Sequence, residues 1–354
     1  MIEEKIVVNA TALDGGGALS ILRQFVLNIP ENEIAWLVFI SPEVKIKCDK
    51  YNVKLHPIEG VKSLFKRFWW DSFGLKRWLR NNQINPLASV SLQNTGFNIG
   101  KTVPSFIYYH QSIPFYRYCW NPLKKRERTL WFYKYIYPFF VKFFLKKDTH
   151  VFVQLNYIKK NFVKKFNHPN KLVNVFSPDI SKIESKRNFI EINAKCLFYP
   201  ASNVFYKNHQ VLYKALQHLD EPIELYLTIE GKDDNKIKHL GPLTYEQVCE
   251  IYNKADALVF PSYIETFGLP LIEAAMRGLP IIAADLPYSR EVLNGYEGVE
   301  YVSFQNPDQW LKAIKRLNKN KRYKPLDISN RPGWKDLLDY ILNKITNKDV
   351  SVQE

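Results

Sequence analysis

The chain alternates short apolar runs with longer segments in which apolar residues recur every three or four positions. The short runs predict buried strands, and the longer segments predict helices. In the first half of the chain the predicted strands cover residues 5–10, 34–40, 87–92, 103–110, 150–154 and 172–176, and the predicted helices cover 18–28, 64–80, 124–146 and 156–166. Strands that alternate with helices are typical of stacked β-α-β units. We therefore expect a Rossmann-like domain with a parallel sheet over residues 1–177.

A polar, lysine-rich stretch interrupts this alternation, and we interpret residues 178–194 as a linker. After it the predicted strands cover residues 196–201, 223–229, 257–262 and 280–285, and the predicted helices lie near 207–219, 244–254 and 270–277. Thr244 and Gln247 have the spacing of a capping box, and Gly278 stands where a helix commonly stops. Residues 195–330 are thus predicted to form a second Rossmann-like domain. Residues 331–354 include an amphipathic helix, for which a return to the N-terminal domain is one option.

A length of 354 residues and a hydrophobic content of 46% agree with two domains. The four cysteines lie far apart, which argues against a disulfide framework or a zinc site and fits a reducing cytoplasm. The longest apolar stretch, residues 131–145, contains Lys134, Pro138 and Lys142 and is shorter than the about 20 residues that cross a bilayer. The N-terminus carries acids where a signal peptide carries bases. A soluble or peripheral protein is expected.

A formal net charge of +15 indicates a polyanionic partner, unless it only reflects a lysine-rich composition. The stretches 64–80 and 114–147 interleave basic with aromatic residues. Such stretches suit an anionic membrane surface, with Trp and Tyr at the level of the headgroups. They equally suit helices whose aromatic side chains pack on a sheet. Single-stranded nucleic acid is a third possible partner, but it would leave the chemistry of the second domain unexplained.

Candidate chemistry concentrates in the second domain, within residues 259–285. Glu265 and Glu273 lie on either side of a Thr-Phe-Gly-Leu-Pro turn, and a helix is expected to begin at Leu269 or Pro270. The backbone N–H groups of residues 266–269 would then face an anion such as a phosphate. A carboxylate beside a phosphate needs hydrogen-bond donors of its own, and sugar hydroxyls supply them. Together these groups indicate a site for a nucleotide-sugar.

The segment PSYIETFGLPLIEA resembles the E-x7-E signature of retaining glycosyltransferases of family 4, also called glycosyltransferase group 1. That family has the α/β fold called GT-B, in which two Rossmann-like domains face a central cleft. The resemblance implies that Glu273 binds the ribose hydroxyls of the donor and that Glu265 faces the transferred sugar. It also implies that backbone groups of the turn contact the donor, namely those of Thr266, Phe267, Gly268 and Leu269.

The same resemblance places Lys207 on the donor diphosphate. Many members carry an arginine five positions earlier, where this chain has Ser202, so Lys207 would neutralise more of the charge, assisted by Asn208. No Asp-x-Asp occurs, and the nearest approach to it is the adjacent pair Asp233 and Asp234. We therefore expect a reaction without metal or cofactor, in which lysine and helix-terminus amides offset the charge of the leaving group.

In the first domain, three glycines, Gly15, Gly16 and Gly17, link a predicted strand to a helix. They would let an acceptor or a donor phosphate approach the backbone closely, but they form no G-x-G-x-x-G fingerprint of nicotinamide binding. His110 ends a predicted strand at the edge that would face the cleft. The resemblance implies a catalytic histidine near the reacting sugar at such a place. Asn94 is a further candidate for lining the cleft.

These features predict a retaining glycosyltransferase that moves a sugar from a nucleotide-diphosphate sugar to a glycan or a lipid-linked saccharide. The resemblance further implies cell-surface polysaccharide biosynthesis, such as that of capsule or lipopolysaccharide, in the cytoplasm or on the inner face of the cytoplasmic membrane. It also implies that the acceptor hydroxyl attacks the face from which the nucleotide diphosphate departs. Three alternatives stay open: a nucleotide-sugar epimerase on the same fold, a basic nucleic-acid-binding protein, and a sugar-binding relic without catalysis.

Overall fold

The structure, a computed structural model, describes residues 3–61, 63–180 and 194–350. The chain divides into two compact units, one formed by Met1–Asp179 with Arg331–Glu354 and the other by Ile180–Asn330. The predicted linker over 178–194 lies for the most part outside the described residues.

The first unit is built on a seven-stranded, all-parallel sheet in the order β3-β2-β1-β4-β5-β6-β7. The central strands are buried on both faces, which explains their continuous apolar sequences. The strands are β1 (Glu3–Ala10), β2 (Ala35–Ile40), β3 (Val53–Pro57), β4 (Ile84–Ser91), β5 (Ser105–Tyr109), β6 (His150–Val153) and β7 (Val173–Val175). The reversal of strand order beside β1 is the arrangement of a doubly wound Rossmann-like domain.

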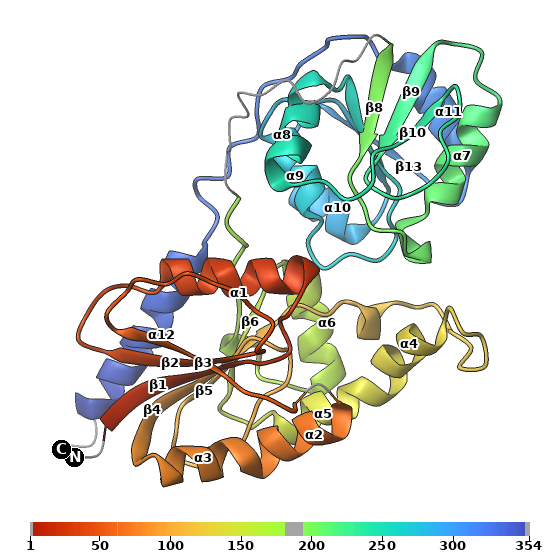
Figure 1. Cartoon of the computed structure of the whole chain (residues 1–354). Coiled ribbons are helices and arrows are strands. Elements are labelled where there is room, and N and C mark those ends of the chain that lie inside the picture. The colour runs from red at the N-terminus through yellow and green to blue at the C-terminus, as the bar shows by residue number, and fades with distance from the viewer. Residues whose placement is uncertain (1–2, 62, 181–193, 351–354) are drawn as a thin grey trace. The chain divides into compact units, whose positions relative to one another are not determined.

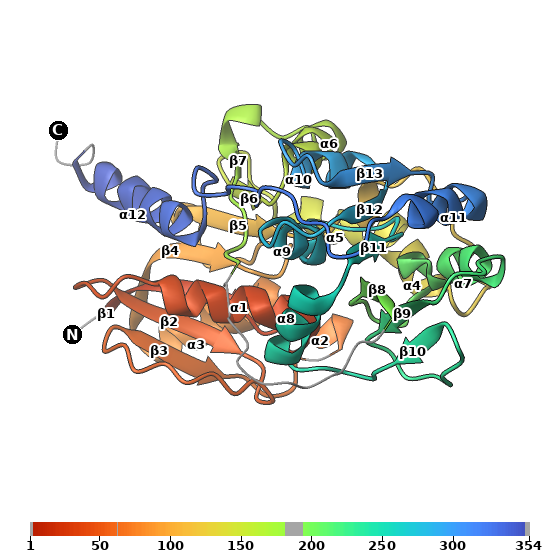
Figure 2. The same ribbon diagram turned by 90° about the horizontal axis from the view of Figure 1, so that it is seen from above.

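Helices cover both faces of this sheet (Figures 1 and 2). The α-helices are α1 (Gly16–Asn28), α2 (Leu64–Trp69), α3 (Leu75–Asn81), α4 (Arg128–Trp131), α5 (Tyr137–Phe144), α6 (Asn156–Phe166) and α12 (Trp334–Val350). The other helical turns are η1 (Trp70–Gly74), η2 (Ile113–Phe115), η3 (Phe132–Ile136) and η4 (Asn170–Leu172). Helices α1 and α12 pack on one face with Val8 and Val90, and α3 packs on the other with Val7 and Leu37.

The C-terminal helix α12 belongs to the core of the first unit. Its apolar side chains on one stripe, Trp334, Leu337, Leu338 and Ile341, are no more than 1% exposed. The Trp334 ring meets that of Phe25 edge-on at 5.9 Å, and its Nε1 donates to Gln24 Oε1 at 2.7 Å. Helix α12, which follows the second unit in sequence, thus covers part of the sheet of the first unit.

Two long helices predicted in this unit are not regular. The helix predicted over 124–146 begins only at Arg128 and contains the π-helical turn η3 just before α5. Because Pro138 has no N–H and its ring clashes with the preceding turn, regular α-helical bonding does not continue through it. The helix predicted over 64–80 likewise has the π-helical turn η1 at its centre, between α2 and α3.

The second unit has a six-stranded parallel sheet in the order β10-β9-β8-β11-β12-β13, so that the same reversal of order occurs beside β8. Its strands are β8 (Lys195–Tyr199), β9 (Ile223–Leu227), β10 (Ile237–His239), β11 (Ala257–Phe260), β12 (Ile281–Ala284) and β13 (Val299–Val302). Its helices are η5 (Phe205–Lys207), α7 (His209–Gln217), α8 (Tyr245–Lys254), α9 (Leu269–Ala275), α10 (Pro287–Val292) and α11 (Pro307–Arg316). The prediction of two Rossmann-like domains is confirmed.

Helix ends in the second unit follow their local sequence signals. The Thr244 hydroxyl caps α8 by accepting a hydrogen bond from the backbone N–H of Gln247, and the Gln247 side-chain oxygen accepts one from the backbone N–H of Thr244. These two bonds confirm the capping box. Gly278 follows α9 with a φ of +69°, as expected of a helix stop. An added Cβ there would lie 2.2 Å from the carbonyl oxygen of Tyr323, so only glycine fits.

Candidate functional site

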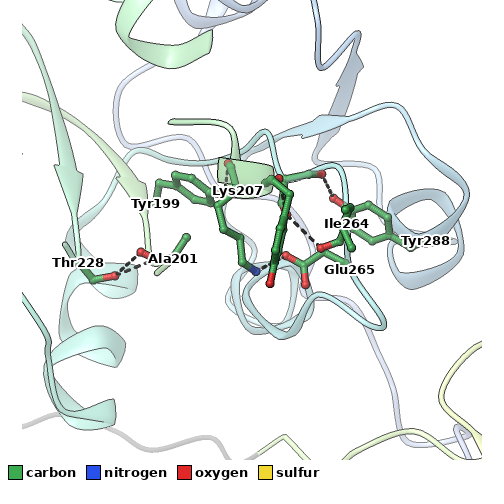
Figure 3. Close-up of polar contacts among 9 residues, drawn as sticks. Tyr199, Ala201, Lys207, Thr228, Ile264, Glu265 and Tyr288 are labelled. Atoms are coloured by element: carbon green, nitrogen blue, oxygen red, sulfur yellow. Dashed lines mark hydrogen bonds and ion pairs between the residues drawn. The ribbon is translucent and has the colours of Figure 1, made fainter. Parts of the chain in front are cut away.

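The centre of the second sheet brings the predicted donor residues together. Strands β8 and β11 pair directly, so the loops at their carboxyl ends lie side by side. The loop after β8 carries Lys207, and the loop after β11 carries Glu265. Lys207 Nζ lies 2.5 Å from Glu265 Oε1, with 18% and 13% of the two side chains exposed (Figure 3). The two residues therefore form a largely shielded ion pair at the predicted ligand-binding edge.

Three hydrogen bonds from tyrosines hold this pair in place. The hydroxyl of Tyr199, in β8, donates to the backbone oxygen of Lys207 at 2.6 Å. The hydroxyl of Tyr288, in α10, donates to the backbone oxygen of Ser262 at 2.6 Å (Figure 3). The backbone N–H of Tyr263 donates to the oxygen of Tyr206 at 3.0 Å and ties the two loops to each other. Buried bonds of this kind fix backbone positions, so the ammonium and the carboxylate are presented by rigid loops.

The turn between the two glutamates has the predicted form. Helix α9 begins at Leu269, and Gly268 caps it with a φ of +87°, a value that a side chain would strain. An added Cβ at Gly268 would also lie 3.3 Å from both Leu271 and Tyr288. The Phe267 side chain is buried, and Thr266 is half-buried. Any donor contact from Phe267 or Gly268 would therefore come from the backbone.

Glu273 lies in α9 and is 8% exposed. Its Oε2 accepts a hydrogen bond from the Tyr252 hydroxyl at 3.0 Å. Burial raises the pKa of Glu273, while hydrogen bonds from Tyr252 and Tyr245 and the charge of Arg277 act in the opposite direction. Two tyrosines thus bond this buried carboxylate, an environment that sequence reasoning did not predict.

Two further predicted donor residues have different surroundings. Ser202 is exposed, in the loop after β8. The Nδ2 group of Asn208 donates to the backbone oxygens of Phe304 at 2.7 Å and Pro261 at 3.3 Å. Both amide hydrogens are engaged in this way, so Asn208 positions the Lys207 loop against the loops that follow β11 and β13.

In the first unit, His110 and Asn94 are brought together at the carboxyl ends of β5 and β4. The His110 backbone N–H donates to Asn94 Oδ1 at 2.6 Å, and Asn94 adopts a φ of +69°. The His110 Nε2 lies 3.0 Å from the oxygen of Leu92. Burial lowers the pKa of His110 to about 4, with the bond to Leu92 opposing this shift. His110 is therefore neutral near pH 7, and its Nε2 carries the hydrogen that Leu92 accepts.

The three predicted glycines lie at the start of α1. Gly15 is the N-cap in an extended conformation, and Gly16 has a φ of +54°. No atom lies within 4 Å of a Cβ added at Gly15, Gly16 or Gly17. Open space beside the backbone, and not internal packing, is thus the feature that these glycines provide.

Sequence reasoning missed a buried polar cluster at the same edge of the first sheet. Asp71 in η1 is 2% exposed, and its Oδ1 accepts from Asn9 Nδ2 at 2.7 Å and from Gln93 Nε2 at 3.2 Å. The Gln93 Oε1 accepts in turn from the N–H of Ala12 at 3.2 Å. Burial raises the pKa of Asp71 to about 7, against hydrogen bonds from Asn9 and Gln93 and the charge of Arg67. The only sequence signal was one acid within a basic, aromatic stretch.

Within the ranges 3–61, 63–180 and 194–350, no group of three or more His, Cys, Asp or Glu side chains is placed to hold a metal ion. None of the helices described there combines the length and apolar character needed to span a bilayer.

Part of the chain is similar in sequence to known proteins. Residues 181–331 match the family described as glycosyl transferases group 1. The O-antigen chain mannosyltransferase RfbU of Salmonella typhimurium is 28% identical over 199 residues, which are 52% of this chain and 55% of RfbU. This chain therefore matches about half the length of that relative.

Solved structures resemble the whole chain. The Anabaena protein HepE, solved with UDP and glucose, superposes with a TM-score of 0.64 at 12% identity, covering 97% of this chain and 99% of that one. The UDP-GlcNAc 2-epimerase of Methanocaldococcus jannaschii gives a TM-score of 0.54 at 11% identity with the same coverage. These likenesses concern the fold, which is that of GT-B proteins. The match to the glycosyl transferases group 1 covers the unit that carries Lys207, Glu265 and Glu273.

Proposed function

We propose that this protein is a glycosyltransferase that moves a sugar from a nucleotide-diphosphate sugar to a saccharide acceptor in cell-surface polysaccharide biosynthesis. The observation that carries the proposal is the ion pair of Lys207 and Glu265 beside the start of α9. The match of residues 181–331 to the glycosyl transferases group 1 supports the reaction class. The name of the Salmonella relative, an O-antigen chain mannosyltransferase, supports the pathway class and a sugar as the transferred group.

The donor binds, in this proposal, at the carboxyl edge of the second sheet. The Lys207 ammonium and the amides of residues 266–269 contact the diphosphate, where a positive charge and N–H donors are most useful. Glu265 accepts hydrogen bonds from the transferred sugar, and Glu273 accepts them from the ribose. Before the donor binds, Glu265 neutralises Lys207. Diphosphate binding would exchange that carboxylate for a phosphate and release Glu265 to the sugar hydroxyls.

The reaction breaks the bond between the anomeric carbon and the diphosphate oxygen and forms a bond from that carbon to the acceptor oxygen, and the proton of the acceptor hydroxyl passes to the departing diphosphate. We propose that configuration is retained, with attack on the face from which the diphosphate leaves. Negative charge grows on the departing oxygen, and Lys207 with the amides of the α9 turn offsets it without help from a metal. Because these groups are held by buried hydrogen bonds, little reorganisation is needed as the charge develops.

The acceptor is assigned to the first unit, at the loops after β1, β4 and β5. The neutral His110 imidazole is fixed by the backbone oxygen of Leu92, while the backbone N–H of His110 donates to Asn94 Oδ1; the imidazole is proposed to contact the reacting sugar. The open backbone of Gly15, Gly16 and Gly17 offers room for a phosphate or a sugar to approach α1. We further propose that the acceptor is a lipid-linked saccharide and that the protein works in the cytoplasm, on the inner face of the membrane.

Donor binding tests the proposal most directly. A panel of nucleotide-sugars is screened by thermal shift, because a ligand that binds the native state raises the unfolding temperature. We expect Lys207→Met to weaken binding of the selected donor about tenfold to a hundredfold, since it removes a charge-assisted contact. The matched control is Lys254→Met, which removes an ion pair to Glu250 at 2.9 Å in the same unit. Equal affinity of the two variants would refute the assignment of Lys207 to the diphosphate.

A second candidate is a nucleotide-sugar epimerase, because a 2-epimerase has the same fold. An epimerase converts the donor without an acceptor, whereas a transferase releases the nucleotide diphosphate only when the acceptor is added or water replaces it. Chromatography of the nucleotide-sugar after incubation without acceptor separates the two. A new nucleotide-sugar epimer in that sample would favour the epimerase.

A further inference from the structure

The first unit carries a continuous apolar surface on α2, η1 and α5. Phe68 contacts both Phe140 and Phe143, with ring centroids 5.8 and 5.4 Å apart, so the two helices lie side by side (Figure 1). Around this contact, large apolar side chains between 47% and 89% exposed project from the surface: Leu64, Phe65, Trp69, Phe73, Phe139 and Phe143. We call these six residues the aromatic face. Soluble proteins seldom expose so many large apolar residues in one place without a partner.

The charge of the protein is concentrated in the same part of the chain. Residues 62–147 contain sixteen Lys and Arg but only two acids, Asp71 and Glu127, whereas the other 268 residues contain thirty-four bases and thirty-three acids. Asp71 is buried, and Glu127 is paired with Lys124 at 3.5 Å. Exposed bases flank the aromatic face directly, among them Lys66 and Lys142. Almost the whole net charge of +15 thus comes from the segment 62–147, which includes the aromatic face.

The inner sides of these elements hold the acceptor edge of the first sheet. In η1, Phe73 is exposed while Asp71 turns inward to bond Asn9 and Gln93. From α5, the hydroxyl of Tyr137 donates to the backbone oxygen of Gln93 at 3.0 Å. The end of β1 and the loop that follows β4 are therefore bonded to the same elements whose outer sides form the aromatic face.

We infer that the aromatic face inserts into the headgroup region of an anionic bilayer, with its phenyl and indole rings reaching the acyl boundary and the flanking bases on lipid phosphates. Exposed aromatic side chains with Lys and Arg beside them are typical of a protein surface that binds at the membrane interface. Naming a membrane, and not a nucleic acid, rests on the proposed function, in which the acceptor is lipid-linked. Docking by this face would place the loops after β1 and β4 next to the membrane that holds such an acceptor.

The test is co-sedimentation of the whole protein with vesicles of phosphatidylcholine containing phosphatidylglycerol. We expect binding that weakens with salt and with a lower fraction of the anionic lipid. The double variant Phe65→Ser/Phe139→Ser should lose binding by tenfold or more, because each ring contributes apolar burial in the membrane. The matched control is Leu27→Ser/Tyr51→Ser, which removes two exposed apolar side chains, 63% and 75% exposed, elsewhere in the same unit.

Trp69, which is 54% exposed, gives a second readout. Its emission should shift to shorter wavelength when vesicles are added, and Trp69→Phe should abolish the shift. Absence of vesicle binding at low salt would overturn the inference, as would equal binding by the aromatic-face and control variants. It would also be overturned if the aromatic-face variant still bound vesicles as the parent does but changed from a dimer to a monomer, or still bound vesicles but lost binding to single-stranded oligonucleotides. Donor thermal shifts are measured without vesicles, so a failure of the proposed function is seen separately.

Discussion

Asp71 offers a sharp test of the buried polar cluster at the carboxyl edge of the first sheet. Its carboxyl is 2% exposed and accepts hydrogen bonds from Asn9 and Gln93. We consider the substitution Asp71→Asn, which keeps the size of the side chain and one acceptor oxygen but removes the titration.

The magnitude follows from the pKa. Burial raises the pKa of Asp71 from 3.8 to about 7. The folded state therefore binds this proton more tightly than the unfolded chain does. The stabilising contribution of the protonated group is fully present below about pH 4 and is lost as the pH rises through about 7. A change of this size corresponds to about 4 kcal/mol in the free energy of unfolding. The asparagine variant should not show this loss.

Tryptophan fluorescence can follow the first unit by itself. Seven of the eight tryptophans lie in the first unit, and Trp310 is the one in the second. In a Trp310→Phe background, urea unfolding of the first unit is measured from pH 4 to pH 8 with and without Asp71→Asn. The lowered pKa of His110 gives the opposite pH dependence, but it occurs in both proteins and cancels in their difference.

We expect the free energy of unfolding of the variant, relative to that of the parent, to increase by about 4 kcal/mol between pH 4 and pH 8. A relative stability that stays constant across this range would show that Asp71 titrates as an ordinary carboxyl. The burial argument for the cluster would then be wrong.

Three other substitutions test the second unit. Tyr252→Phe removes the hydroxyl that is bonded to the buried Glu273 and should lower the free energy of unfolding by about 1.5–3 kcal/mol near pH 7. It should also raise the KM for the donor, and an unchanged KM would show that Glu273 does not take part in donor binding. Gly278→Ala should lower the free energy of unfolding by at least about 1–2 kcal/mol, measured by urea unfolding followed by circular dichroism, because φ is +69° and the added Cβ meets the Tyr323 carbonyl. A neutral effect would contradict the geometry of this turn. Thr244→Ala should lower the free energy of unfolding by about 1 kcal/mol because the capping box is lost, whereas Thr244→Ser should retain most of that stability.

Much of the fold could be predicted because buried parallel strands are continuous apolar runs. The sequence predicted β1, β2, β4, β5, β6 and β7 in the first unit and β8, β9, β11 and β12 in the second. It missed β3 and β10, which lie at sheet edges where fewer residues are buried, so their sequences lack a continuous apolar signal. It also missed β13, at the other edge, and the helix α11, whose cap at Asn306 and apolar Trp310 were readable.

The sequence by itself determined the motif of the candidate site, because the spacing of Glu265 and Glu273 around Gly268 depends on one turn and one helix start. Only the tertiary structure decided what those residues contact. The pairing of Lys207 with Glu265 and the cover of Glu273 by Tyr252 join residues that are 58 and 21 positions apart. The clustering of Asp71 with Asn9 and Gln93 and the aromatic face depend likewise on how helices dock on a sheet. Local propensity cannot specify such contacts, since they are set by packing between elements distant in sequence.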